Sequence, residues 1–321
     1  MLQQTQVVTV IPYYLRFLAR FPAVAALAEA SLDELLAQWR GLGYYSRARS
    51  LHKAAKEIYA RYGGQIPDTL SDLRALPGIG DYSAGAILSI AFGRDIVAID
   101  GNVRRVLCRL FNYAGDPSDR TGKLVMHEFA QALLPSGHAG TFNQAMMELG
   151  ATICSVNSPR CTECPLTAHC AARALGVQEE RPVTVRRNPL PRRYIVSTLV
   201  ERDQRLLLVR RIPKGLLGGL WELPGGELQA DEENAPGLER LLATHLGVKV
   251  TVGEQCATQR HAYTHFLSFV SVYYCAIAGT PLPQHIWDAA RWLSPDELAG
   301  YGLSGVTVKV LRTLGYTITH L

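Results

Sequence analysis

Four of the seven cysteines in this chain of 321 residues lie between residues 154 and 170, in the spacing C-x6-C-x2-C-x5-C. A loop this short can bring four thiolates around one iron–sulfur cube. Zinc is the chemical rival, but structural zinc sites tend to use two C-x2-C pairs, and only one such pair occurs here. Four buried structural cysteines are disfavoured by the prolines and polar residues between them. We therefore expect a 4Fe–4S cluster, with the ligands Cys154, Cys161, Cys164 and Cys170.

The length, the charge and the start of the chain limit the class of protein. A chain of 321 residues exceeds what one hydrophobic core usually serves, so we expect two domains. The net charge of +5 permits nucleic-acid binding without demanding it. No run of about 18 apolar residues is present to span a bilayer, and the start has neither region of a signal peptide. We expect a cytoplasmic protein whose cysteines bind metal rather than form disulfides.

Apolar positions recur at helical spacing from the start of the chain to about residue 172, which predicts an all-α first part. Ser31, Ser71 and Asp100 each stand where a helix would begin, and each is a plausible N-cap. Glu29, Asp33 and Glu34 fall on what the pattern indicates is an amphipathic surface helix. We therefore expect these three acidic residues to be solvated.

The sequence pattern changes after the cysteines. Residues 181–193 carry five Arg, three Pro and no acid, which suits an exposed, extended linker. Beyond the linker, strand patterns occur at 194–201, 205–211 and 266–275, and helical patterns near 231–246 and 305–314. We expect an all-α domain over 1–172, a basic linker over 173–193 and an α+β domain over 194–321.

The segment L-P-G-I-G-D-Y-S-A-G-A places Gly78 and Gly80 in a turn that opens directly into a helix. Glycines let the backbone approach a partner closely, and the free N–H groups of a helix start suit a DNA phosphate. Taken alone, the turn could equally be an ordinary connection between helices. Asp100 follows the apolar stretch I-V-A-I and begins D-G-N-V-R-R-V-L, so its carboxylate is expected at a helix N-terminus beside the hairpin. Without further context it would be a simple N-cap.

Together, the hairpin, the aspartate and the cysteine loop resemble the helix-hairpin-helix DNA glycosylase superfamily that includes endonuclease III. The resemblance implies that Asp100 stabilises the oxocarbenium-like sugar as the base departs, and that Asn102 orients it. In the endonuclease III branch, a Lys of the hairpin helix attacks the sugar through its amine. The matching catalytic-site residue here is Tyr82, so we expect a monofunctional enzyme that cannot cleave the strand through such an amine.

Three further segments resemble the adenine DNA glycosylase (MutY) family, and the similarity covers nearly the whole chain. They are M-L-Q-Q-T-Q-V at the start, G-L-G-Y-Y-S-R-A-R and F-N-Q-A-M-M-E-L-G-A. The resemblance implies that Gln4 and Tyr44 insert into the base stack opposite the extruded adenine. It also implies that Leu2 lines the adenine pocket and that Gln144 hydrogen-bonds the base. For Leu2 and Tyr44, core packing is the alternative that the residue pattern alone would favour.

The family also supplies a general acid, because adenine leaves more easily once its ring is protonated. That acid is a Glu in a W-x-x-E-V-M-L-Q-Q-T-Q segment, and it would stand two residues before Met1. No later acidic residue replaces it by motif. We expect the true start to lie upstream. The alternative is a fragment or a degenerate copy that binds lesions without catalysis.

The second domain contains W-E-L-P-G-G-E followed by a helix that ends in L-G-V, which resembles a Nudix hydrolase. Nudix chemistry needs glutamates on that helix to bind Mg²⁺, and the aligned stretch from Arg240 to Val248 has lost them. The resemblance therefore implies a Nudix-like fold without hydrolysis, as in the recognition domain of the adenine glycosylases. In those proteins an F-S-H loop contacts 8-oxoguanine, and the counterpart here is Tyr263, Thr264 and His265. A polar turn between strands is the alternative.

These features predict a base-excision repair enzyme. It would hydrolyse the glycosidic bond of adenine mispaired with 8-oxoguanine or guanine in double-stranded DNA. We expect a monomer of bacterial origin that acts at the nucleoid and makes no membrane contact. The alternatives are a lesion-binding protein without catalysis, a Nudix nucleotide hydrolase and a glycosylase/lyase of the endonuclease III kind.

Overall fold

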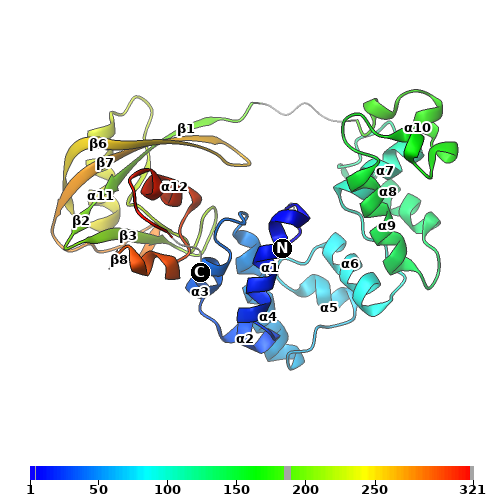
Figure 1. The fold of residues 1–321 in the computed structure, drawn as a ribbon, viewed down its shortest axis with the longest axis horizontal. Coiled ribbons are helices and arrows are strands. Elements are labelled where there is room, and N and C mark those ends of the chain that lie inside the picture. The colour runs from blue at the N-terminus through cyan, green and yellow to red at the C-terminus, as the bar shows by residue number, and fades with distance from the viewer. Residues whose placement is uncertain (4, 184–188, 319–321) are drawn as a thin grey trace. The chain divides into compact units, whose positions relative to one another are not determined.

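The computed structural model describes residues 1–3, 5–183 and 189–318. Its contacts divide the chain into two compact units, Ile66–Asn188 and Met1–Gln65 with Pro189–Leu321. We call the first the helical unit and the second the mixed unit, and Figure 1 labels the elements of both. The expected domain boundaries, after residue 172 and before residue 194, stay a prediction. The two units are defined by contacts between residues, which need not coincide with domains as a protein family defines them. None of the helices within the described ranges is long and apolar enough to cross a membrane.

The helical unit is built around three helices whose apolar faces meet in one core. Leu107, Met126 and Met146, one from each helix, are buried there. A close approach of backbone adds to the packing, since a Cβ atom on Gly85 would lie 2.2 Å from the carbonyl oxygen of Val97. The elements of this unit are α5 (Leu70–Ala75), α6 (Asp81–Phe92), α7 (Gly101–Leu110), α8 (Arg120–Leu133), α9 (Ala139–Thr152), η1 (Cys161–Glu163), η2 (Thr167–His169), α10 (Ala171–Ala174) and η3 (Gln178–Glu180).

Side-chain caps fix several helix starts. Ser31 and Asp100 are N-caps, as predicted, and accept hydrogen bonds from the backbone N–H groups of the third residue after each. The prediction for Ser71 is wrong, because α5 begins two residues earlier and its N-cap is Thr69. Thr69 accepts a hydrogen bond of 3.2 Å from the N–H of Asp72, so the cap and the third helical residue form a capping pair.

The mixed unit joins four N-terminal helices to two β-sheets with helices around them. The helices and strands of this unit are α1 (Val7–Arg20), α2 (Val24–Glu29), α3 (Leu32–Gln38), α4 (Ser46–Tyr62), β1 (Arg192–Leu199), β2 (Glu201–Arg202), β3 (Arg205–Arg211), β4 (Trp221–Glu222), β5 (Gly225–Glu227), α11 (Asn234–Leu246), β6 (Lys249–Ala262), β7 (Leu267–Ala278), β8 (Trp287–Leu293), η4 (Asp296–Gly300) and α12 (Gly305–Thr313). One sheet has the order β5-β1-β7-β6, with β1 and β7 parallel and the other neighbours antiparallel. In the second sheet, β3 pairs antiparallel with β2, β4 and β8.

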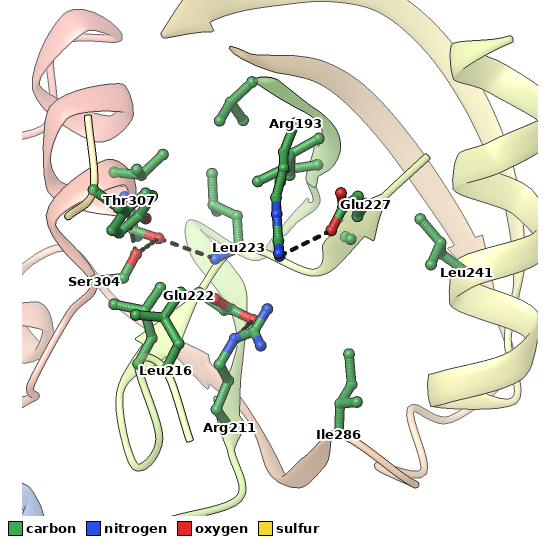
Figure 2. A pocket seen from close by; sticks show the side chains of 18 of the residues that line it. Arg193, Arg211, Leu216, Glu222, Leu223, Glu227, Leu241, Ile286, Ser304 and Thr307 are labelled. Atoms are coloured by element: carbon green, nitrogen blue, oxygen red, sulfur yellow. Dashed lines mark hydrogen bonds and ion pairs between the residues drawn. The ribbon is translucent and has the colours of Figure 1, made fainter. Parts of the chain in front are cut away.

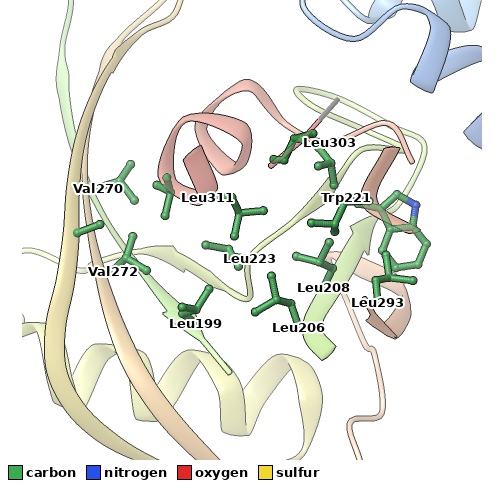
Figure 3. Packing of buried hydrophobic residues seen from close by; sticks show 14 residues of the cluster. Leu199, Leu206, Leu208, Trp221, Leu223, Val270, Val272, Leu293, Leu303 and Leu311 are labelled. Atoms are coloured by element: carbon green, nitrogen blue, oxygen red, sulfur yellow. The ribbon is translucent and has the colours of Figure 1, made fainter. Parts of the chain in front are cut away.

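The strand β3 lies between two cores, which explains its nearly continuous apolar sequence. Leu206 and Leu208 point into the core between the sheets and α12, together with Val270 of β7 (Figure 3). Leu207 and Val209 alternate with them and pack against the core that contains α11. A strand buried on both faces carries no polar alternation. The strand and helix patterns predicted beyond residue 193 are therefore confirmed in type, with ends that shift by a few residues.

The N-terminal helices of the mixed unit pack against its sheets through Asp33, which corrects the expectation that this residue is solvated. Asp33 accepts hydrogen bonds from Trp221 Nε1 at 3.1 Å and from Arg210 Nη1 at 3.2 Å. Burial alone would lower the pKa of Arg210, but its hydrogen bonds and ion pairs with Asp288 and Asp33 raise that pKa overall. Asp33 thus neutralises a cation at the junction between α3 and the strands.

Replacing Asp33 by Asn should lower the free energy of unfolding by about 1–2 kcal/mol, because the amide keeps an acceptor for Trp221 but loses the charge opposite Arg210. Thermal or urea unfolding measures this loss. The matched control is Glu29→Gln, an exposed carboxylate on α2, which should change the stability by less than about 0.5 kcal/mol. Equal stabilities for the two variants would contradict a structural role for Asp33.

Candidate functional site

Asp100 is held by two hydrogen bonds at the N-terminus of α7. Its Oδ1 accepts from the backbone N–H of Val103 at 2.7 Å, and its Oδ2 accepts from Asn102 Nδ2 at 3.1 Å. The side chain is half-buried, and each oxygen takes only one of these two bonds. A carboxylate fixed in this way can stabilise a positive charge that develops next to it, without first having to reorient.

Asn102 is itself positioned by a buried arginine that also reaches the cysteine loop. Arg105 is 8% exposed and donates to Asn102 Oδ1 at 2.9 Å and to the carbonyl oxygens of Gly150 at 2.7 Å and Cys154 at 2.8 Å. Gly150 permits this approach, since a Cβ atom there would lie 2.6 Å from the Cβ of Asn102. One hydrogen-bonded chain therefore connects Asp100 with the first cysteine of the loop.

Tyr82 lies in the first turn of α6 and donates its hydroxyl to Met147 Sδ at 3.6 Å. Burial, and then the charge of Asp100, raise the pKa of Tyr82, so its hydroxyl stays protonated at neutral pH. Gln144 is on α9, the helix of Met147, where its exposed amide donates to the carbonyl oxygen of Gly140 at 3.1 Å.

In the predicted helix-hairpin-helix turn, the backbone conformation favours glycine at one of the two glycine positions. Gly78 has φ +79°, in the left-handed region that favours glycine. Gly80 is the N-cap of α6, and a Cβ atom placed on it would have no heavy atom within 4 Å. The space beside Gly80 on its Cβ side is therefore open, and the binding of a DNA phosphate by the N–H groups of this helix start stays a prediction.

The cysteine loop is held together by a second buried arginine of α7. Arg109 is 2% exposed and donates to carbonyl oxygens of the loop, those of Ser155 at 2.6 Å and Val156 at 2.9 Å. It also donates to the carbonyl oxygen and the Sγ of Cys154, both at 3.3 Å. The backbone carbonyl of Arg109 accepts from Cys170 Sγ at 3.4 Å. The side chain of Arg109 thus binds the Cys154 end of the loop to α7, and the backbone carbonyl of the same residue binds the Cys170 end.

The four cysteines line one cavity of about 30 Å³, together with Arg109 and Arg173, and none is in a disulfide. Throughout the described residues, no three Cys, His, Asp or Glu side chains are close enough to hold a single metal ion. A cube differs from a mononuclear site, because its thiolates bind around a cluster rather than a single ion. Two arginines beside four thiolates also offset negative charge. Four sulfur donors around one cavity are the ligand type of an iron–sulfur cluster and also of a zinc ion, so the expected 4Fe–4S cluster stays a prediction.

Of the residues expected in the base stack, Gln4 lies outside the described residues. Leu2 is 59% exposed and Tyr44 is 45% exposed, so neither packs in a core. Arg47, which the sequence analysis did not single out, orders this region. It donates to the carbonyl oxygens of Met1 at 2.7 Å and Gly43 at 3.2 Å, and its guanidinium lies 5.3 Å from the ring centre of Tyr44.

The turn between β6 and β7 carries the residues expected to read the lesion, but they do not share one face. Thr264 and His265 are exposed, and Thr264 Oγ1 donates to Tyr44 Oη at 3.5 Å. Tyr263 instead lines a cavity and packs against Phe266, with ring centres 4.6 Å apart. Burial, and then the charge of Glu222, raise its pKa to about 12. The structure therefore brings together Thr264 and Tyr44, whereas a contact of Tyr263 with a lesion stays a prediction.

The glycines of W-E-L-P-G-G-E have a structural purpose here. A Cβ atom on Gly225 would lie 2.1 Å from the carbonyl oxygen of Val196, and one on Gly226 would lie 2.8 Å from Leu241. The motif therefore allows β5 to approach β1 and α11. In the helix that follows, Arg240 forms a bidentate ion pair with Glu232, with hydrogen bonds of 2.6 and 2.7 Å.

Two protein-family models match successive parts of the chain. Residues 1–133 match the HhH-GPD superfamily of base excision DNA repair proteins, and residues 195–313 match the NUDIX domain. The predicted fold class, a helix-hairpin-helix glycosylase domain followed by an α+β Nudix-like domain, is confirmed. A solved thermostable thymine-DNA glycosylase is similar to 54% of this chain and 80% of its own, at 26% identity and a TM-score of 0.50.

Curated relatives cover almost the whole chain. It is 34% identical to the adenine DNA glycosylase of Rattus norvegicus over 97% of this chain and 69% of that protein. It is 35% identical to the adenine DNA glycosylase of Homo sapiens, over 97% of this chain and 66% of that protein. The chain therefore spans about two thirds of the length of these mammalian proteins. The adenine DNA glycosylase of Buchnera aphidicola subsp. Acyrthosiphon pisum is 31% identical, over 84% of this chain and 75% of that protein. Because relatives occur in animals and in a bacterium, they do not support the expected bacterial origin.

Proposed function

The chain belongs to the adenine DNA glycosylase family, and from this membership we propose that it removes adenine mispaired with 8-oxoguanine or guanine, acting as a monomer on double-stranded DNA. The observation that carries the proposal is the half-buried Asp100 carboxylate, fixed by Val103 and Asn102 beside the hairpin helix. Lesion binding without catalysis would not need a carboxylate held in this geometry.

The proposed reaction is hydrolysis of the bond between the sugar and adenine. As the base departs with the bonding electrons and a proton, positive charge develops on the sugar, and Asp100 stabilises that charge. Water then adds to the sugar through its oxygen to form the new C–OH bond, and the proton that this water loses balances the proton taken up by the departing base. Tyr82 has no amine, so it cannot form a Schiff base with the opened sugar. We therefore expect release of adenine without cleavage of the strand, and borohydride should trap no adduct with DNA.

The cysteine loop is proposed to hold a 4Fe–4S cluster through Cys154, Cys161, Cys164 and Cys170, with Arg109 beside the first of them. When bound, such a cluster crosslinks the loop and can accept or donate an electron. The role of this chain's own residues is to fix the loop against α7. Iron and acid-labile sulfide in equal amounts, without zinc, would support the cluster. One zinc ion per chain would contradict it.

The exposed turn is proposed to contact the base opposite adenine through Thr264 and His265, with Tyr44 beside them. His265→Ala should lower the preference for 8-oxoguanine over guanine by about tenfold, because an imidazole can hydrogen-bond and stack on an oxidised purine. Rates of adenine release from the two mispairs measure this preference. The control is His127→Ala, an exposed histidine of α8. Equal losses on both mispairs would show that His265 does not distinguish the two bases.

A further inference from the structure

One face of the sheet β5-β1-β7-β6 carries a row of aromatic and basic side chains that the proposed glycosylase reaction does not use. Tyr194 of β1 stands directly opposite Phe269 of β7, and Phe269 stands opposite Arg260 of β6. Residues that are directly opposite on neighbouring strands share one face of a sheet. We call these three residues the aromatic row. Because neighbouring strands lie about 4.8 Å apart, the row spans about 10 Å.

The aromatic row lies on the face of the sheet that packs against α11, at a place that the helix does not cover. Val196 stands two residues after Tyr194 in β1, so the two side chains point to the same face. Val196 is fully buried in the core that contains Leu238 of α11, whereas Tyr194 is 56% exposed. Arg260 is exposed as well, and Phe269 is half-buried. The row is therefore open to a partner.

The three side chains of the row hold one another in place. The rings of Tyr194 and Phe269 are stacked, with their centres 5.6 Å apart and their planes inclined by 25°. The guanidinium of Arg260 lies 5.9 Å from the ring centre of Phe269. Stacking and cation–π contacts of this kind favour a defined arrangement of the groups. A partner of this surface therefore loses little free energy to the ordering of the side chains that it meets.

The surroundings of the aromatic row are basic. The two neighbouring rows of the same face contain no acidic side chain, and they consist of Arg192, Leu267 and Ala262 on one side and Val196, Ser271 and Thr258 on the other. Arg193 points to the opposite face, where Figure 2 shows it paired with Glu227 beside the cavity. Arg192 and Arg260 are exposed, and no acidic residue in the described part of the chain forms an ion pair with either. This surface therefore attracts a negatively charged partner.

We propose that the aromatic row binds single-stranded nucleic acid, with a base stacked on Tyr194 as a continuation of the ring pair and with phosphates beside Arg192 and Arg260. A duplex hides the faces of its bases inside the stack, so an unpaired strand is the form that offers them to exposed rings. At about 3.4 Å per nucleotide, the row accommodates about three nucleotides. The proposal goes beyond the removal of adenine, whose substrate is double-stranded DNA.

The test is binding of a labelled oligothymidine of about ten nucleotides to the full chain, measured by fluorescence anisotropy at low salt. Tyr194→Leu keeps an apolar side chain against Phe269 but removes the ring, so it should weaken the oligothymidine about tenfold. The matched control is Tyr274→Leu, which removes a tyrosine that is 52% exposed on the opposite face of β7 and should bind like the parent. Equal affinity of Tyr194→Leu and the parent chain would overturn the proposal, and so would a parent chain that does not bind.

A second variant leaves the ring pair intact, so it tests the surface even if Tyr194→Leu lowers the melting temperature. Arg260→Gln removes one phosphate contact, which should reduce the slope of log affinity against log salt by about 0.7. Its control is Arg202→Gln in the other sheet, where the exposed Arg202 guanidinium lies 4.8 Å from the ring centre of Trp292. This control should keep the slope of the parent chain. An unchanged slope for Arg260→Gln would overturn the assignment of Arg260 to a phosphate.

A duplex of the same length separates an unpaired strand from double-stranded DNA. Tyr194→Leu should weaken the oligothymidine much more than it weakens the duplex, and an equal loss for both would overturn the assignment to an unpaired strand. DNA and RNA share the ring faces and the phosphates, so the tighter binder of oligothymidine and oligouridine identifies the source of the strand. The inference does not depend on the proposed glycosylase reaction, because strand binding is measured without any release of adenine. Failure of either experiment therefore leaves the other proposal standing.

Discussion

The variant Asp100→Asn is expected to release adenine about 10²- to 10³-fold more slowly than the parent chain, because it removes the negative charge opposite the developing cation. The amide is nearly the same size, and Asn is as good an N-cap as Asp, so α7 should still begin at the same residue. Single-turnover release of adenine measures the rate. The melting temperature and the affinity for the mispaired duplex should remain close to those of the parent.

The control for this variant is Asp119→Asn. Asp119 is the N-cap of α8 and accepts from the N–H of Gly122 at 2.6 Å, so it has the same local geometry as Asp100 without its neighbours. Its substitution should leave adenine release unchanged. Unaltered release by Asp100→Asn would refute the role of Asp100 in the reaction.

The variant Arg109→Met is expected to lower the free energy of unfolding by about 3–5 kcal/mol, because it removes several charge-assisted hydrogen bonds from a buried guanidinium to carbonyl oxygens of the cysteine loop. Methionine fills much of the same space, so the loss reflects hydrogen bonds more than volume. Since the lost bonds hold the part of the loop that contains Cys154, the iron content per chain should fall as well. Urea unfolding and metal analysis measure the two effects.

The helix α7 offers a matched control in Arg104→Met. Arg104 has one hydrogen bond of 3.4 Å, to Ser118 Oγ, and it is not buried. This variant should retain both its iron and its stability to within about 0.5 kcal/mol. If Arg109→Met behaved in the same way, the proposal that Arg109 holds the cysteine loop would have to be abandoned.

Local signals predicted much of this fold. The residue pattern indicated helices up to the cysteines and strands beyond residue 193, and the N-caps Ser31 and Asp100 are confirmed. The error at Ser71 is also local. Thr69 stands three residues before Asp72, and this capping pair was the better signal for the start of α5.

Other features depend on partners that are distant in the sequence. Asp33 looks like a surface residue of α3, and nothing near it indicates that Trp221 and Arg210 will bind its carboxylate. The structural roles of Arg105 and Arg109 are likewise not predictable from the residues near them in the sequence. Their acceptors are mostly backbone carbonyls, which every residue has, so no side-chain pattern marks them.

The turn between β6 and β7 shows the limit of a motif. The resemblance indicates three residues for contact with a lesion, but it does not indicate which way each side chain points. Tyr263 is turned toward the cavity with Phe266, and Thr264 is placed beside Tyr44. The cavity itself is lined by residues from several strands and helices, so it has no compact signature in the sequence.

The most direct test of the proposed function is the release of free adenine by the protein purified from the cells that make it. The substrates are a duplex with adenine opposite 8-oxoguanine and the same duplex with adenine opposite thymine. We expect adenine from the first duplex, with the strand left uncut, and none from the second. Tight binding of the first duplex without any release of adenine would contradict the account and would instead identify a protein that binds lesions without catalysis.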